Sequence, residues 1–299
     1  MTTSAVRILV ATAVPAERDA VAQAFPDPYG ETRTLPGGVT LRHLVVERGL
    51  SGRALSAGAP STPDLSTTGR TGRGADAGGI TGTTGPGADT GGTTGTTGPT
   101  PSPRYDLLAA GVGPALAAAS TATALTAAAL EGAPYDLVVS AGIAGGFAPD
   151  APVASLVLAD HITAADLGAE TADGFLPVTD LGFGVVTHTS PPDLVRRAAA
   201  ATGARAGTVL TVSTVTGTAG RADALRARHP GALAEAMEGF GVAEAAVAHG
   251  VPVLELRAVS NAVGPRDRSA WRIKDALESL TAGFGKLAPV LESWKPYDH

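Results

Sequence analysis

The segment YDLVVSAGIAGG, residues 135–146, carries the pattern that decides the fold. Its first part, YDLVVSAG at 135–142, is typical of a buried strand, and more glycines follow where that strand is expected to end. Similar apolar runs alternate along the chain with alanine-rich runs of helical length. This alternation predicts a single three-layer α/β domain, in which a twisted, mixed but largely parallel sheet lies between helices.

These runs predict seven strands and six helices. The strands are expected at 7–13, 39–46, 105–111, 135–142, 154–160, 207–213 and 251–259. The helices are expected at 15–25, 114–130, 191–202, 219–228, 239–249 and 271–291. Because ligands of such sheets bind at the carboxyl ends of the strands, the residues that follow each strand are the first candidates for a functional site.

Residues 51–104 differ in composition from the rest of the 299-residue chain, because Gly, Thr, Ser, Pro and Ala dominate them. Leu55, Leu65 and Ile80 are their only large apolar side chains, too few to offset the entropy of ordering the segment. We therefore interpret 51–104 as a low-complexity, flexible insertion into one domain that spans 1–299.

The composition excludes several classes of function. The chain has no cysteine, and its six histidines show no metal-binding spacing, so neither thiolate chemistry nor a metal site is expected. The net charge of −6 argues against nucleic-acid binding. No segment has the length and apolarity of a membrane span or signal peptide. We expect a cytoplasmic protein without membrane or nucleic-acid partners.

Five motifs follow predicted strands. They are Glu17 within AVPAE, AGVG at 110–113, GIAGG at 142–146, MEG at 237–239 and RAVSN at 257–261. Each has an ordinary interpretation of its own: an acid near a helix N-terminus, a glycine turn, a core methionine or an asparagine that caps a turn.

As an ordered set, these motifs resemble those of the purine nucleoside phosphorylase and nucleosidase family. The resemblance implies a nucleoside phosphorylase-like fold, cleavage of an N-ribosidic bond in a small-molecule nucleoside, no cofactor, and a homodimer or higher homo-oligomer. NAVGPRDRSAWRI at 261–273 and DLGAETADGF at 166–175 resemble extensions of the branch that cleaves futalosine. That branch releases hypoxanthine in an alternative route to menaquinone.

The resemblance also implies roles for individual residues. Glu17 would be the general base that takes a proton from the attacking water. Glu238 would accept hydrogen bonds from the ribose hydroxyls, and Met237 would lie against the ribose. Arg257 would orient the water or the two glutamates, although a structural ion pair with a buried carboxylate is an equal alternative.

Three further residues belong to the glycine-rich motifs and are expected to line the substrate: Gly111, Gly142 and Ile143. No basic residue lies near either motif in the sequence, so a phosphate nucleophile would lack its charge partners. We therefore expect hydrolysis and not phosphorolysis.

Asn261 indicates which base is bound. The adenine-specific nucleosidases of the family carry aspartate where this chain has Asn261, and an ionised carboxylate would oppose the oxygen of a 6-oxopurine. An amide offers both a donor and an acceptor, which favours hypoxanthine or guanine over adenine. Ser260 is expected to fix the orientation of the amide, or else to cap the strand.

Arginines follow this motif closely. Futalosine carries an aryl ketone with a carboxylate in place of the 5′-hydroxyl of inosine, and Arg266, Arg268 or Arg272 could bind that carboxylate while Trp271 stacks on the aryl ring. Alternatively, the arginines form an ion-pair cluster with Asp267, and Trp271 anchors the last helix.

Two other functions remain open at this point. The first is a nucleosidase or phosphorylase of inosine or guanosine in which the arginines are purely structural. The second is a non-catalytic purine nucleoside-binding protein, which would have no need of a base such as Glu17 beside the sugar.

Overall fold

The computed structural model describes residues 5–46 and 102–295. The predicted insertion, 51–104, lies almost wholly outside the described residues. Its last residue, Arg104, is the first residue of strand β4, so the insertion ends earlier than the composition indicates.

All six predicted helices are present. Helices α1, α2 and α3 each begin with proline, whose missing N–H and fixed φ suit the first turn of a helix. The α-helices are α1 (Pro15–Ala22), α2 (Pro114–Leu130), α3 (Pro192–Thr202), α4 (Ala219–Arg228), α5 (Gly239–Ala248) and α6 (Ile273–Ser293). Two short 3₁₀ helices are η1 (Pro36–Gly38) and η2 (Arg268–Ala270).

The seven predicted strands are also present. They are β1 (Arg7–Thr12), β3 (Thr40–Val45), β4 (Arg104–Ala109), β5 (Leu137–Gly146), β6 (Leu156–Ala164), β10 (Arg205–Thr211) and β12 (Val253–Ala262). Five strands were not predicted: β2 (Glu31–Thr34), β7 (Gly168–Thr171), β8 (Gly174–Pro177), β9 (Thr187–Thr189) and β11 (Ala232–Ala236). All five have at most five residues. Strand β2 is exposed throughout, whereas β11 is buried throughout, but its sequence ALAEA does not give the large apolar run on which the prediction depended.

The main sheet has ten strands in the order β11-β10-β6-β12-β5-β1-β4-β3-β2, with β9 beside β6. Strand β11 also pairs with β5, so β5, β12, β6, β10 and β11 form a closed ring at one end of the sheet. Parallel and antiparallel pairings are equally numerous among the described strands of this sheet. The prediction of a mixed α/β sheet is confirmed. Its largely parallel character is confirmed only in part, because the parallel pairings include more residue pairs but the antiparallel pairings are as numerous.

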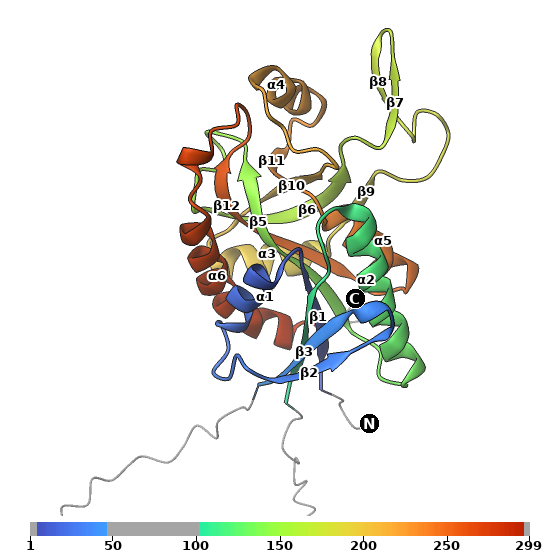
Figure 1. Cartoon of the computed structure of the whole chain (residues 1–299), viewed down its shortest axis with the longest axis vertical. Helices are drawn as coiled ribbons and strands as arrows, with labels where there is room; N and C mark the ends of the chain where they lie inside the picture. The colour runs from blue at the N-terminus through green and yellow to red at the C-terminus, as the bar shows by residue number, and fades with distance from the viewer. Residues whose placement is uncertain (1–4, 47–101, 296–299) are drawn as a thin grey trace, which may run out of the picture. The chain divides into compact units, whose positions relative to one another are not determined.

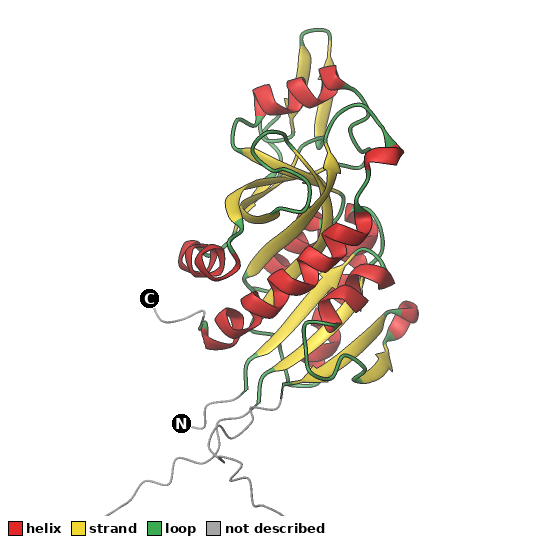
Figure 2. Ribbon diagram, turned by 90° about the vertical axis from the view of Figure 1, so that its left-hand side faces the viewer, coloured by secondary structure: helices red, strands yellow, loops and turns green. Residues whose placement is uncertain are grey.

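Two groups of helices cover the sheet (Figures 1 and 2). One buried apolar cluster joins the strands to α2 and α5, and a second joins them to α1, α3 and α6. A smaller third cluster packs α4 against strands of the closed ring. The hairpin β7–β8, which contains most of the DLGAETADGF segment, projects beyond the ring (Figure 1).

The GIAGG motif is not a turn, as the glycines suggested, because it is the second half of strand β5. None of its glycines has a positive φ. Close neighbours explain the glycines instead: a Cβ at Gly146 would lie 2.1 Å from the carbonyl oxygen of Ala151. The AGVG motif does form a turn, in which Gly111 and Gly113 adopt φ angles of 96° and 90°.

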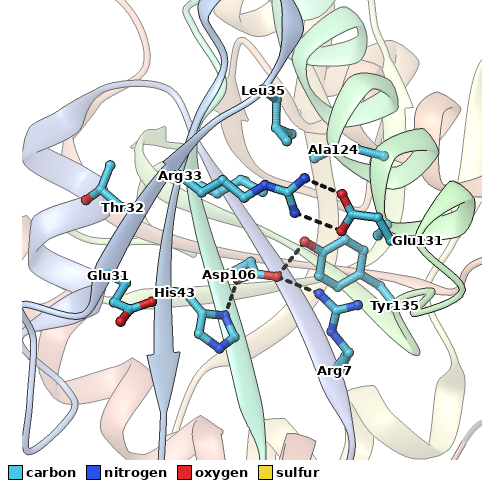
Figure 3. A pocket seen from close by; sticks show the side chains of 13 residues that line it. Arg7, Glu31, Thr32, Arg33, Leu35, His43, Asp106, Ala124, Glu131 and Tyr135 are labelled. Atoms are coloured by element: carbon cyan, nitrogen blue, oxygen red, sulfur yellow. Dashed lines mark hydrogen bonds and ion pairs between the residues drawn. The ribbon is translucent and has the colours of Figure 1, made fainter.

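A polar pocket lies at the amino-terminal end of β1, at the opposite end of that strand from Glu17 (Figure 3). Its centre is the buried carboxylate of Asp106, which accepts hydrogen bonds from Tyr135 Oη at 2.6 Å and Arg7 Nη2 at 3.0 Å. His43 Nδ1 lies 2.6 Å from the other oxygen of Asp106. This network joins strands β1, β3 and β4 to the start of β5.

Replacing Asp106 with alanine should therefore lower the free energy of unfolding by about 3 kcal/mol, because it leaves buried donors without an acceptor. Urea denaturation of the two proteins measures the difference. Glu31→Ala, at an exposed position of the same pocket, is the control and should change stability by less than about 0.5 kcal/mol. Equal effects of the two substitutions would contradict a structural role for the network.

Candidate active site

Arg257 is the centre of a buried polar cluster. It lies in the middle of β12, and only 1% of the residue is exposed. Its Nε donates to Glu255 Oε1 at 2.8 Å, its Nη1 contacts Glu238 Oε2 at 3.3 Å, and its Nη2 donates to Ser140 Oγ at 3.1 Å. The guanidinium therefore links β12 to β5 and to the N-terminus of α5.

Glu17 approaches the same cluster from the first turn of α1. Its Oε2 accepts from the N–H of Ala13 at 2.9 Å, and its Oε1 accepts from the N–H of Ile143 at 2.8 Å. Burial raises the pKa of this carboxyl, whereas Arg257 and the two backbone N–H groups act in the opposite direction. Glu17 is thus a buried carboxylate with raised proton affinity.

Gly142 is the point where Glu17 and Arg257 meet. A Cβ at this position would lie 2.7 Å from Glu17 Oε1 and 2.8 Å from Arg257 Nη1. Glycine is therefore required because both side chains pass directly over the backbone of β5.

Glu238 stands at the N-cap of α5, directly after β11 and Met237. Its Oε1 accepts from the N–H of Gly113 at 3.3 Å, so the AGVG turn contacts the cluster through this carboxylate. Gly111, in the same turn, instead donates its N–H to the carbonyl of Ala13 at 3.0 Å. Met237 is half-buried beside Glu238.

Sequence reasoning missed Glu255, which is fully buried. Its Oε1 accepts from Arg257, whereas its Oε2 has no hydrogen-bond partner within the described residues. Burial raises the pKa of this carboxyl. Three carboxylates, Glu17, Glu238 and Glu255, thus share the single guanidinium of Arg257, so the cluster holds excess negative charge when all are ionised.

Asn261 lies near the carboxyl end of β12, beyond a β-bulge, and is paired with Gly145 of β5. Its Oδ1 accepts from Ser260 Oγ at 2.8 Å, and its Nδ2 donates to the carbonyl of Ala262 at 3.0 Å. Ser260 therefore contacts the amide oxygen, and among the described residues Asn261 Nδ2 has one hydrogen-bond acceptor, the carbonyl of Ala262.

The predicted sites lie along one strand. Ile143 contacts Glu17 and Gly145 lies beside Asn261, so these two contacts are about 7 Å apart along β5, because a strand rises about 3.3 Å per residue. This spacing can accommodate a nucleoside whose ribose lies at the first contact and whose base lies at the second.

The arginines after Asn261 are exposed and flank Trp271, with Arg266 Cζ at 5.3 Å and Arg268 Cζ at 5.8 Å from the ring centroid. Within the described residues Asp267 forms no ion pair with these arginines, and its carboxylate instead accepts from the N–H and hydroxyl of Ser269 in η2. The alternative of an ion-pair cluster around Asp267 is therefore wrong.

Arg272 pairs with Asp275 at 2.5 Å. Trp271 is half-buried and lines a pocket together with Asn261 and Arg266, so it is not a core anchor of the last helix.

The part of the chain that the structure describes contains no group of three His, Cys, Asp or Glu side chains able to hold a metal ion. Among the described helices, none is long and apolar enough to cross a membrane.

Comparison with known proteins gives the class. The model of the Phosphorylase superfamily matches residues 76–288. Two solved structures share the fold: a 5′-methylthioadenosine/S-adenosylhomocysteine nucleosidase from Colwellia psychrerythraea in complex with adenine, and a futalosine hydrolase mutant of Helicobacter pylori. The first has a TM-score of 0.64 at 16% identity and covers 98% of this chain and 96% of its own. The second has a TM-score of 0.65 at 15% identity and covers 96% and 98%. The chain belongs to the Phosphorylase superfamily.

Curated relatives define the group within that class. A futalosine hydrolase from Streptomyces coelicolor is 62% identical over 291 residues, which are 97% of this chain and 99% of that protein. A futalosine hydrolase from Thermus thermophilus is 34% identical over 158 residues, covering 52% of this chain and 70% of that protein. The chain is therefore a member of the futalosine hydrolase family, whose enzymes hydrolyse N-glycosyl bonds, and the predicted family is confirmed.

The close approach of the Glu255 carboxylate to Gly239 gives a test of how the buried cluster is packed. A Cβ at Gly239 would lie 2.3 Å from both carboxylate oxygens of Glu255, so Gly239→Ala should lower the free energy of unfolding by about 2 kcal/mol. In a Glu255→Ala background the same change should be neutral or slightly stabilising, because the obstructing group is absent. Chemical denaturation of the four proteins measures this cycle. An equal cost of Gly239→Ala in both backgrounds would show that Glu255 does not occupy this space.

Proposed function

We propose that this protein hydrolyses the N-ribosidic bond of futalosine and releases hypoxanthine and dehypoxanthine futalosine, a step in menaquinone biosynthesis. The observation that supports this most strongly is that two buried acids, Glu17 and Glu238, lie beside the guanidinium of Arg257. The amide of Asn261 lies further along the same strands. The two acids suit a sugar that becomes cationic, and the amide of Asn261 suits a 6-oxopurine.

Glu17 is the general base in this proposal. Its carboxylate takes a proton from water while the water oxygen bonds to C1′ of the ribose. The bond between C1′ and N9 breaks, and its electron pair leaves with the purine, which takes up either the proton that Glu17 removed from water or one from solvent. Hypoxanthine spreads the negative charge onto its 6-oxygen, so it leaves more easily.

Glu238 accepts hydrogen bonds from the ribose 2′- and 3′-hydroxyls, and its charge stabilises the cationic sugar. Met237 lies against the ribose from the neighbouring position. Arg257 keeps its place by bonding Glu255 and Ser140, and it contacts Glu238 on the side that faces Ile143. Its role is to position the carboxylates.

Water is the nucleophile that suits this site better than phosphate. Arg257 is the cation that acts on Glu17, and its N–H groups are already directed at Glu238, Glu255, Ser140 and the carbonyl of Ile143. A phosphate ion would have to compete with carboxylates for this one cation and would be repelled by them.

Asn261 donates from its amide to O6 or N7 of hypoxanthine, with Ser260 fixing the amide. Arg266, which lines the pocket of Asn261, and Arg268, on Trp271, are the residues proposed to bind the carboxylate of the 5′-aryl ketone. A homo-oligomer and a cytoplasmic location remain predictions from the family resemblance and the sequence.

The experiment that tests the function is an assay of hypoxanthine release from futalosine and from inosine, with and without inorganic phosphate. We expect futalosine to be cleaved without phosphate, and a product with the mass of dehypoxanthine futalosine. A preference for inosine, or a requirement for phosphate, would support a purine nucleosidase or phosphorylase instead.

Glu17→Gln separates catalysis from binding. The substitution keeps the size of the side chain and removes the base, so turnover should fall by at least 100-fold while futalosine still binds. Single-turnover kinetics and calorimetry measure the two quantities. Retained turnover would eliminate Glu17 as the base, and absence of turnover in both proteins would favour a nucleoside-binding protein.

The raised pKa of Glu17 determines how kcat/KM for futalosine cleavage should depend on pH. The base must be ionised, so kcat/KM should fall as the pH is lowered through this pKa, and the acid limb should lie above the usual glutamate value of about 4.3. A pH profile of futalosine cleavage between pH 4 and 9, as a rough working range, measures the limb. An acid limb at or below the ordinary glutamate value would exclude Glu17 as the titrating group.

A further inference from the structure

Glu235 is a buried acid to which the proposed mechanism gives no role. It lies in β11, two residues before Met237, and only 6% of the residue is exposed. It forms no ion pair within 4.0 Å in the described part of the chain, and the nearby charges of Arg221 and Asp166 oppose one another in their effect on it. A buried carboxylate without a cation is costly, so its presence calls for a compensating function.

The position of Glu235 in the closed ring directs it to the base site. Gly145 of β5 is paired with Glu235 on one side and with Asn261 on the other. The two side chains therefore start about 10 Å apart, on strands that flank a residue without a side chain. Both line one pocket, whose other members include Thr216, Arg266 and Trp271.

Thr216 fixes the carboxylate as an acceptor. The N–H of Thr216 donates to Glu235 Oε1 at 2.7 Å, and the Thr216 hydroxyl donates to Oε2. Both oxygens thus accept a hydrogen bond, which suits the ionised form and holds the group in one orientation. A carboxylate has about four acceptor positions, so it can accept further hydrogen bonds from a ligand.

The hydrogen-bonding groups of a 6-oxopurine match those of Glu235 and Asn261. Its N1 carries a hydrogen, next to the acceptor O6, and N7 lies on the far side of O6. We propose that Glu235 determines base specificity by accepting the N1–H of the purine while Asn261 binds its O6 and N7 edge. The proposal rests on the proposed function, because it assumes that a 6-oxopurine occupies this pocket.

Together, Glu235 and Asn261 would exclude 6-aminopurines from this pocket. Adenine has a lone pair at N1 and no hydrogen, so the carboxylate of Glu235 would face an acceptor with an acceptor. A site that is built to receive an N–H rejects the analogue that lacks it, because the buried acceptor is left unpaired. Asn261 alone does not discriminate as strongly, since N7 of adenine can accept the same amide N–H as N7 of hypoxanthine.

The test measures binding of the free bases hypoxanthine, 1-methylhypoxanthine and adenine by calorimetry, so that it needs no turnover. The wild-type protein should bind hypoxanthine at least 10-fold more tightly than either other base. Glu235→Gln should weaken hypoxanthine by roughly 10- to 100-fold and change adenine by less than about 3-fold, because the amide can donate to N1 of adenine. Glu244→Gln, at an acid of α5 whose side chain contacts His188, is the matched control and should leave all three affinities unchanged.

Three results would overturn the proposal: equal losses of hypoxanthine and adenine binding in Glu235→Gln, no loss of either, or no preference of the wild-type protein for hypoxanthine over 1-methylhypoxanthine. The last comparison needs no variant, so it holds even if Glu235→Gln does not fold. Wild-type protein that binds hypoxanthine selectively but does not cleave futalosine would contradict the proposed function and leave the assignment of Glu235 standing.

Discussion

The burial of one guanidinium among three carboxylates is the constraint on which this site depends. Arg257 is held inside the protein by Glu238 and Glu255, and Glu17 lies against it across Gly142. A buried cation without such partners would be strongly unfavourable, and so would three buried acids without the cation. Each side chain is therefore fixed by the others, which gives a preorganised site for a reaction in which positive charge develops on the sugar.

Strand β5 allows this arrangement because three of its last five residues are glycines. Gly142 permits Glu17 and Arg257 to meet, and Gly145 leaves space between Glu235 and Asn261. Closure of the ring through the pairing of β11 with β5 brings Glu235 and Glu238 to this strand. The fold thus places the acids that we propose for the sugar at one point of β5, and the groups that we propose for the base further along it.

The sequence predicted the elements well where the signal is local. Helix α2 occupies the predicted residues because proline opens it and Glu131-Gly132 follow its alanine-rich run. Glu17, Glu238 and Arg257 were identified because they follow or lie within recognisable motifs, and the structure brings them together. Glu255 and Glu235 were missed because each lies inside a strand. The significance of Glu235 depends on Gly145 and Thr216, which are distant in sequence, and that of Glu255 depends on the side-chain packing around Arg257, which no local pattern reveals. The pairing of β11 with β5 is nonlocal in the same way.

The central claim is that sugar and base lie along β5, with the ribose at Glu238 and the purine between Glu235 and Asn261. A crystal structure of the Glu17→Gln protein with futalosine bound measures this most directly. We predict the ribose hydroxyls within hydrogen-bond distance of Glu238, and the hypoxanthine with N1 toward Glu235 and O6 toward Asn261. Futalosine bound in another pocket, or a purine that contacts neither Glu235 nor Asn261, would contradict the account.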